Sequence, residues 1–145
     1  MKLKDNSLFK RLLAVLATID HPYIEKFIGA YINKTKIFLI TDRTGINLSR
    51  LFENRALFPI DEGDKTILAF KVAQAISYLH SRSIMHRNLI PTNIYVGKSD
   101  EIIQKIIGFR NSRFIPKENS IEMISLSIDS KAPVSYFTAP KLEDC

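Results

Sequence analysis

The sequence has little of several residues that mark particular protein classes. Among its 145 residues it has a single cysteine, Cys145, no tryptophan and only five glycines. One cysteine excludes a disulfide within the chain, which fits a reducing compartment, so we expect a cytoplasmic protein. No apolar run approaches the roughly 20 residues that a membrane-spanning helix needs, and we expect no membrane partner.

The residues that are present predict a folded, soluble domain. Hydrophobic residues make up 46% of the chain and charged residues 25%, which is enough apolar material for one core. The formal net charge is +6, with Lys and Arg spread along the chain. We interpret this as a solvated basic surface and expect no nucleic-acid partner, with nucleic-acid binding kept as a weaker alternative.

Hydrophobic periodicity predicts a mixture of helices and strands. Apolar residues recur at spacings of three and four over residues 8–19, which predicts an amphipathic helix that ends before Pro22. The other predicted elements are strands at 24–32 and 36–41 around a turn at 33–35, a short helix at 47–54, a long helix at 61–82, a loop at 83–92, strands at 93–96 and 102–107, and a long polar loop at 111–133. The fold class expected from this order is α+β.

The most specific pattern follows the predicted long helix. The helix ends in Tyr78-Leu79-His80, and the loop continues with His86-Arg87-Asn88-Leu89 and then Asn93. This segment resembles the catalytic region of eukaryotic protein kinases, whose loop reads H-R-D-L-x-x-x-N between a helix and a short strand pair.

Three further motifs carry the same resemblance in the same order. Gly108-Phe109-Arg110 stands where the family has Asp-Phe-Gly, and Ala139-Pro140-Lys141 where it has Ala-Pro-Glu. His21-Pro22-Tyr23-Ile24 is similar to the stretch after the regulatory helix, in the style of the tyrosine-kinase-like group.

The resemblance implies a single partial protein-kinase-like domain. Residues 1–44 would be the remnant of the small lobe, with the regulatory helix and the hinge strands. Residues 45–145 would run from the start of the large lobe through the catalytic loop and the activation segment. The five glycines form no G-x-G-x-x-G, so the glycine-rich loop and the phosphate-binding lysine are expected before Met1. The remaining large-lobe helices are expected after Cys145.

The resemblance also assigns catalytic positions. Asn88 takes the place of the aspartate that accepts or orients the substrate hydroxyl proton, and an amide cannot take a proton. His86 and Arg87 precede it. We interpret His86 as mainly architectural. In active relatives Arg87 can pair with a phosphate on the activation loop, which here holds Ser120, Ser125, Ser127 and Ser130, but we interpret these serines as a solvated polar loop.

ATP and Mg²⁺ are the cofactors that the resemblance implies. Thr41 would be the gatekeeper, and Asp42 and Thr44 would belong to the hinge that holds adenine. Asn93 matches the second metal ligand, although a turn residue or strand cap is an equal alternative. Gly108 replaces the metal-binding aspartate, and Asn93 alone is a poor magnesium site because Mg²⁺ requires several oxygen ligands.

Further substitutions fall at regulatory positions. The glutamate that pairs with the phosphate-binding lysine is replaced by Leu12, the lysine after the catalytic Asp-Leu pair by Ile90, and the glutamate of Ala-Pro-Glu by Lys141. The function expected from the whole set is a catalytically inactive pseudokinase that binds protein partners. The alternatives are an atypical Ser/Thr or Tyr kinase completed by missing segments or a partner chain, and a fragmentary product that folds poorly alone.

Overall fold

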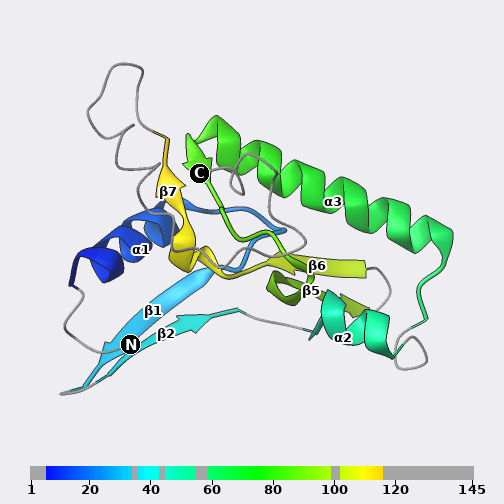
Figure 1. The fold of residues 1–145 in the computed structure, drawn as a ribbon, viewed down its shortest axis with the longest axis horizontal. Helices are drawn as coiled ribbons and strands as arrows, with labels where there is room; N and C mark the ends of the chain where they lie inside the picture. Colours follow the sequence, from blue (N-terminus) through cyan, green and yellow to red (C-terminus); the bar gives the residue numbers. More distant parts are fainter. Residues whose placement is uncertain (1–5, 34–35, 43–44, 55–58, 99–101, 116–145) are drawn as a thin grey trace, which may run out of the picture.

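The computed structural model describes residues 6–33, 36–42, 45–54, 59–98 and 102–115. Within these ranges the chain forms three α-helices, seven short strands and two 3₁₀ turns. Figure 1 shows the long helix α3 lying along one side of the described fold. Helix α1 lies at the opposite end from α2, and the β1–β2 hairpin extends outward below α1 in this view. The mixed helix and sheet content agrees with a partial protein-kinase-like fold.

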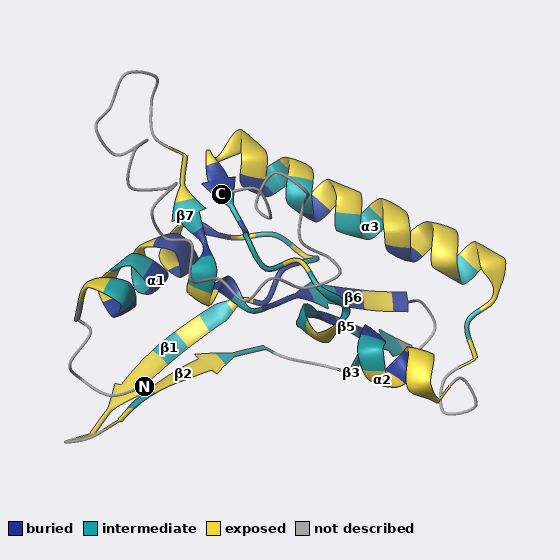
Figure 2. Ribbon diagram, in the orientation of Figure 1, coloured by how far each residue is buried: buried dark blue, intermediate teal, exposed yellow. Residues whose placement is uncertain are grey.

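Helix α1, Asn6–Thr18, confirms the predicted amphipathic helix. Its buried side chains, Leu12, Val15 and Leu16, follow the expected spacing of three and four residues. The helix ends just before the Asp20-His21-Pro22 turn, because the residue before a proline is disfavoured in the helical region. The apolar face of α1 therefore points into the core (Figure 2).

Strands β1, Phe27–Ile32, and β2, Ile37–Thr41, form the predicted antiparallel hairpin. The first strand begins three residues later than the sequence predicted. Ile24 instead makes a parallel bridge to Ile106, and the Glu25 N–H donates to the Ile106 carbonyl at 2.9 Å. Residues 24 and 25 thus connect the hairpin to the rest of the fold.

Helix α2, Leu48–Glu53, is capped by the Asn47 side chain, which accepts from the Arg50 N–H at 2.9 Å. Helix α3, Glu62–Ser81, begins with a capping box, in which Asp61 and Asp64 each accept from the other's backbone N–H. Both helices agree with the sequence prediction. Of the described residues, none belongs to a helix long and apolar enough to cross a membrane.

A small antiparallel sheet lies beside α3. It has the order β3–β5–β6, with β3 at Ile46–Asn47, β5 at Ile94–Lys98 and β6 at Ile102–Ile106. The sequence predicted the last two strands. It predicted only loop where β4, Ile84–Met85, pairs with β7, Arg113–Phe114, because two-residue strands carry no periodic signal.

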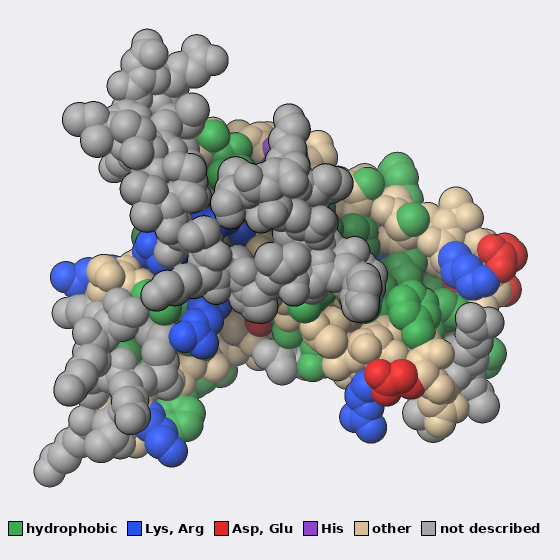
Figure 3. All heavy atoms as spheres, in the orientation of Figure 1, with side chains coloured by type: hydrophobic (Ala, Val, Ile, Leu, Met, Phe, Trp, Pro, Cys, Tyr) green, Lys and Arg blue, Asp and Glu red, His purple; other side chains and the backbone are tan. Residues whose placement is uncertain are grey.

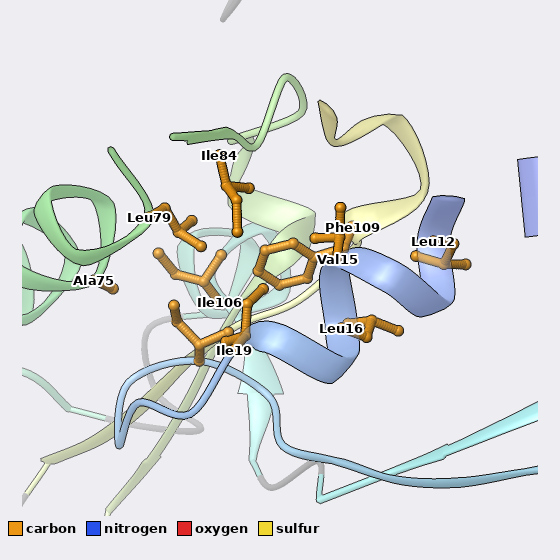
Figure 4. Close-up of a cluster of buried hydrophobic side chains, with 10 residues drawn as sticks. Leu12, Val15, Leu16, Ile19, Ala75, Leu79, Ile84, Ile106 and Phe109 are labelled. Carbon is orange, nitrogen blue, oxygen red and sulfur yellow. The ribbon is translucent and has the colours of Figure 1, made fainter. Parts of the chain in front are cut away.

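The main core lies where α1, α3 and the end of β6 meet. Figure 4 shows Phe109 between Val15 of α1 and Ile106 of β6, with Leu79 and Ile84 closing the cluster from the α3 side. A smaller cluster joins α2, α3 and the β5–β6 sheet through Leu48, Leu68, Val96 and Ile102. The catalytic-loop segment, residues 85–93, follows Ile84 of the first cluster and precedes Ile94 of the second.

Candidate functional site

His86 is the structural centre of the catalytic-loop segment. Its side chain is buried, its Nε2 lies 2.9 Å from the Ile107 carbonyl oxygen, and its Nδ1 accepts from the Asn88 N–H at 3.3 Å. These two bonds assign the neutral imidazole with the proton on Nε2. The architectural role predicted for His86 agrees with this geometry.

Burial favours the neutral form of His86. Removal from water lowers the pKa of this imidazole below its usual value, and the hydrogen bond to the Ile107 carbonyl only partly opposes the shift. The ring also makes an edge-to-face contact with Phe109, with centroids 4.7 Å apart. His86 thus connects the loop to the core as a neutral, packed ring.

Arg87 and Asn88 follow in a strained turn. Arg87 has φ +62°, a left-handed conformation that costs a non-glycine residue roughly 1–2 kcal/mol. Such strain persists only where neighbouring contacts impose it, and it concentrates at functional sites. The Asn88 side chain forms no hydrogen bond with another described residue, so the amide at the base position is not committed to the fold.

Asn93 and Gly108 are brought into direct contact. Asn93 ends the 3₁₀ turn η2, Pro91–Asn93, and its Nδ2 donates to the Asn88 carbonyl at 2.9 Å. Gly108, which begins the turn η3, Phe109–Asn111, has φ +87°. A Cβ at position 108 would lie 2.7 Å from the Asn93 Oδ1, so the Asn93 amide fills the space that a side chain there would need.

The structure places a carboxylate beside Gly108 that the sequence motifs did not indicate. Glu25 is only 7% exposed, and its Oε1 accepts from the Gly108 N–H at 3.1 Å. No cationic side chain in the described part of the chain pairs with it. The one available signal was the Glu25-Lys26 pair of charged residues between the apolar residues Tyr23, Ile24, Phe27 and Ile28.

The predicted hinge is described only in part. Thr41 is half-buried at the end of β2, opposite Phe27 in the strand register. The Asp42 carboxylate forms an ion pair with Lys105 at 2.9 Å and also accepts from the Lys26 N–H. Thr44 lies outside the described residues. The structure therefore gives Asp42 a bracing role between β2 and β6.

The Asp42 carboxyl is held ionised by this arrangement. Burial acts to raise its pKa, but the hydrogen bond and charge of Lys105 together with the Lys26 N–H lower the pKa below its usual value. The ion pair is partly exposed, so its net contribution to stability is small.

At the regulatory helix, an apolar contact occupies the position of the family's ion pair. Leu12 is buried in the cluster that contains Phe109, where Figure 4 shows it on α1. A carboxylate in this cluster would be desolvated without a described cationic partner. The predicted loss of the glutamate is thus accommodated by packing.

Some predicted motif residues cannot be placed. Ala139-Pro140-Lys141, the serines of residues 120–130 and most of the predicted loop at 111–133 lie outside the described residues. Ile90 is described, and its carbonyl accepts from the Asn93 N–H at 2.8 Å. Its side chain brings no charge to the position where the family has lysine.

The site has the order of elements that the protein-kinase motifs predict. Helix α3 leads into a loop with the buried His86, the β5–β6 strand pair follows, and the turn at Phe109 packs against α1. The chain matches the model of the protein kinase domain family over residues 2–142. It therefore belongs to the protein kinase family.

Similar proteins come from several organisms. Calcium-dependent protein kinase 3 of Plasmodium yoelii yoelii is 28% identical over 143 residues, which cover 97% of this chain and 25% of that protein. The Aurora kinase of Saccharomyces cerevisiae is 25% identical over 125 residues, which cover 86% of this chain and 33% of that protein. A Dictyostelium discoideum protein named "Probable serine/threonine-protein kinase kinY" is 34% identical over 125 residues, covering 75% and 21%. The chain thus spans a third or less of the length of each.

Protein kinase domains generally use ATP and Mg²⁺, and the residues around Gly108 can be compared with that requirement. Within the described ranges, no three His, Cys, Asp or Glu side chains form a metal-binding group. Two oxygen-bearing groups nevertheless flank Gly108, the Glu25 carboxylate and the Asn93 amide. Mg²⁺ is commonly held by one or two carboxylates, with water and phosphate oxygens in the other positions. By the chemistry of their oxygen donors these two groups fit that pattern, with the carboxylate supplied by Glu25 and not by residue 108.

Proposed function

We propose that this protein-kinase-family chain acts as a pseudokinase, by binding or regulation and without transferring phosphate itself. The observation that carries the proposal is the amide of Asn88 at the position of the catalytic aspartate. A positioned base contributes typically ~10²–10⁴-fold to such a reaction, and an amide cannot accept the hydroxyl proton. The surrounding loop keeps its architecture through the buried His86.

Two contacts around the loop support the proposal. The Asn93 amide occupies the space beside Gly108 and donates to the Asn88 carbonyl. Leu12 occupies the position of the regulatory glutamate and packs into the same cluster as Phe109. The Asn93 contact holds the loop and the Leu12 contact holds the helix, and neither contact involves a group that could react with ATP or a hydroxyl.

The finer parts of the proposal rest on sequence. A binding role implies protein partners, and the single cysteine favours a cytoplasmic location. The motif His21-Pro22-Tyr23-Ile24 supports placement in the style of the tyrosine-kinase-like group. On the face in Figure 3, Lys and Arg side chains stand at several separate places, which supports the interpretation of a solvated basic surface.

A second candidate is an atypical Ser/Thr or Tyr kinase that uses ATP and is completed by further segments or a partner chain. The observation that favours it is the Glu25 carboxylate beside Gly108, which restores a negative charge close to the position of the missing aspartate. This candidate requires that the reaction proceed without a base at residue 88.

The two candidates differ in a phosphoryl-transfer assay with the purified chain in excess over ATP. Mass spectrometry would follow phosphate on the chain and on added Ser/Thr and Tyr acceptor proteins, with Mg²⁺ or Mn²⁺. The pseudokinase proposal predicts no product above that of a chain-free control. Transfer by the wild-type chain that disappears in Asn93→Ala would establish the second candidate and overturn the first.

A further inference from the structure

The Glu25 carboxylate is in an unusual environment for a charged group. Its residue is 7% exposed, one oxygen accepts from the Gly108 N–H, and no described cation pairs with it. Buried carboxylates in proteins are generally paired with a cation or coordinate a metal, because desolvation of an isolated charge is costly. The Gly108 N–H is bonded to Oε1, so Oε2 of Glu25 is the oxygen that can take a positive partner.

The backbone fixes where this carboxylate lies. The Glu25 N–H donates to the Ile106 carbonyl at 2.9 Å, and the Ile106 N–H donates to the Tyr23 carbonyl at 2.9 Å. This parallel pairing sets Glu25 alongside the end of β6, two residues before Gly108. Hydrogen bonds on both sides of Ile24 thus hold Glu25 in register with the turn at residue 108.

A second oxygen ligand approaches the same residue from the catalytic loop. The Asn93 amide lies within 2.7 Å of the position a Gly108 Cβ would take. Because Nδ2 is used in the bond to the Asn88 carbonyl, the Oδ1 is the atom that can accept or coordinate. A glycine at 108 is what allows the Asn93 amide to come so near.

We propose that Glu25 replaces the missing aspartate as the carboxylate ligand of a hard divalent cation, Mg²⁺ or Mn²⁺, at Gly108. Asn93 supplies the second protein oxygen, and water or phosphate oxygens fill the remaining positions, as is usual for such ions. The carboxylate thus reaches the site from the stretch before β1 and not from the residue at position 108.

Binding of Mn²⁺ alone to the full chain tests this inference. Free Mn²⁺ would be measured by electron paramagnetic resonance during a titration of wild type, Glu25→Gln and Glu53→Gln. Glu53 is an exposed acid on α2 and serves as the matched control. We expect Glu25→Gln to weaken Mn²⁺ binding by at least about tenfold, the lower range for losing a group that supports a metal site. Glu53→Gln should leave the affinity unchanged.

Equal Mn²⁺ affinity in wild type and Glu25→Gln, or no binding in wild type, would overturn the proposal. Glutamine keeps an oxygen for the Gly108 N–H, so the fold should survive, and circular dichroism would verify this. If the variant does not fold, nuclear magnetic resonance of the wild type decides. Added Mn²⁺ should first broaden the amide signals of Glu25, Asn93 and Gly108, and broadening that begins elsewhere contradicts the site.

The inference depends on the family relationship and not on the absence of phosphoryl transfer. Failure of Mn²⁺ binding would leave the proposed pseudokinase function standing. Conversely, detection of phosphoryl transfer would end the pseudokinase proposal while leaving the Glu25 metal site intact.

Discussion

The two sides of Phe109 are built on different principles. Toward α1 and α3 its ring packs among buried aliphatic side chains such as Val15 and Ile106, where Leu12 has replaced a charged residue. Toward the catalytic loop the ring makes an edge-to-face contact with His86. Of the loop and turn positions where the family has reacting or metal-binding groups, Asn93 is retained, while Asn88 and Gly108 are substitutions. The comparison shows that on one side apolar packing has replaced a charge, while on the other the architecture stays and two chemical groups have changed.

The largest effect should come from the packed side. Phe109→Ala should lower the free energy of unfolding by ~3–5 kcal/mol, because the ring is almost fully buried and its loss leaves a cavity. Urea unfolding followed by circular dichroism measures this. Phe70→Ala is the matched control, since Phe70 is 62% exposed on α3 and its loss should change stability by no more than ~0.5 kcal/mol. Equal losses in the two variants would remove the basis of the comparison.

A smaller effect should follow from restoring the aspartate on the polar side. Gly108→Asp should cost ~2–3 kcal/mol, from the left-handed φ of residue 108 and loss of the Asn93 hydrogen bond. Gly29→Ala is a suitable control, because no atom lies within 4 Å of its added Cβ. A Gly108→Asp variant as stable as wild type would show that Asn93 moves aside freely. If the variant is destabilised as expected, its lack of activity could come from a distorted loop as well as from missing chemical groups.

Acidification should lower the free energy of unfolding, because His86, which contacts Phe109 from the loop side, is buried as a neutral ring. Burial lowers the pKa of His86, and burial together with the Lys105 charge lowers the pKa of His21. The unfolded chain therefore takes up protons first, and stability is fully present above about pH 6.5, the ordinary imidazole value. Stability should fall as the pH drops below this value. Melting temperatures between pH 7.5 and 5 would measure the slope, and His86→Gln should flatten it more than His80→Gln, since His80 is exposed. A flat profile in wild type would contradict the buried neutral imidazole.

The smallest effect should come from Asn88. Its side chain has no hydrogen bond to another described residue, so Asn88→Ala should change the free energy of unfolding by no more than ~0.5 kcal/mol. Denaturant unfolding of the variant beside wild type measures this. A loss comparable to that of Gly108→Asp would mean that the amide at residue 88 serves the fold and not only the site.

Much of this architecture follows from local sequence. The spacing of Leu12, Val15 and Leu16 predicted α1, and the caps at Asn47 and Asp61 mark the starts of α2 and α3. The histidine and asparagine positions of the loop were predicted because the motif fixes them relative to the helix before them. Periodicity, caps and a contiguous motif are all encoded within a few residues of one another.

The parts that were missed depend on contacts between distant residues. Glu25 and Gly108 are 83 positions apart, and their hydrogen bond arises only from the pairing of residues 23–25 with β6. The same pairing explains why the first hairpin strand begins at Phe27 and not at Ile24. The β4–β7 pair likewise joins residues about thirty positions apart through two-residue strands.

Phosphoryl transfer by wild type and by Asn88→Ala, compared under the same conditions, tests the central claim most directly. If the scaffold is retained and the reacting group is gone, both proteins should give the same background signal with labelled ATP and Mg²⁺ or Mn²⁺. Alanine at residue 88 would then change stability little and activity not at all. Transfer by wild type that falls by roughly 10²-fold or more in Asn88→Ala would show that the amide takes part in catalysis, and would contradict the account.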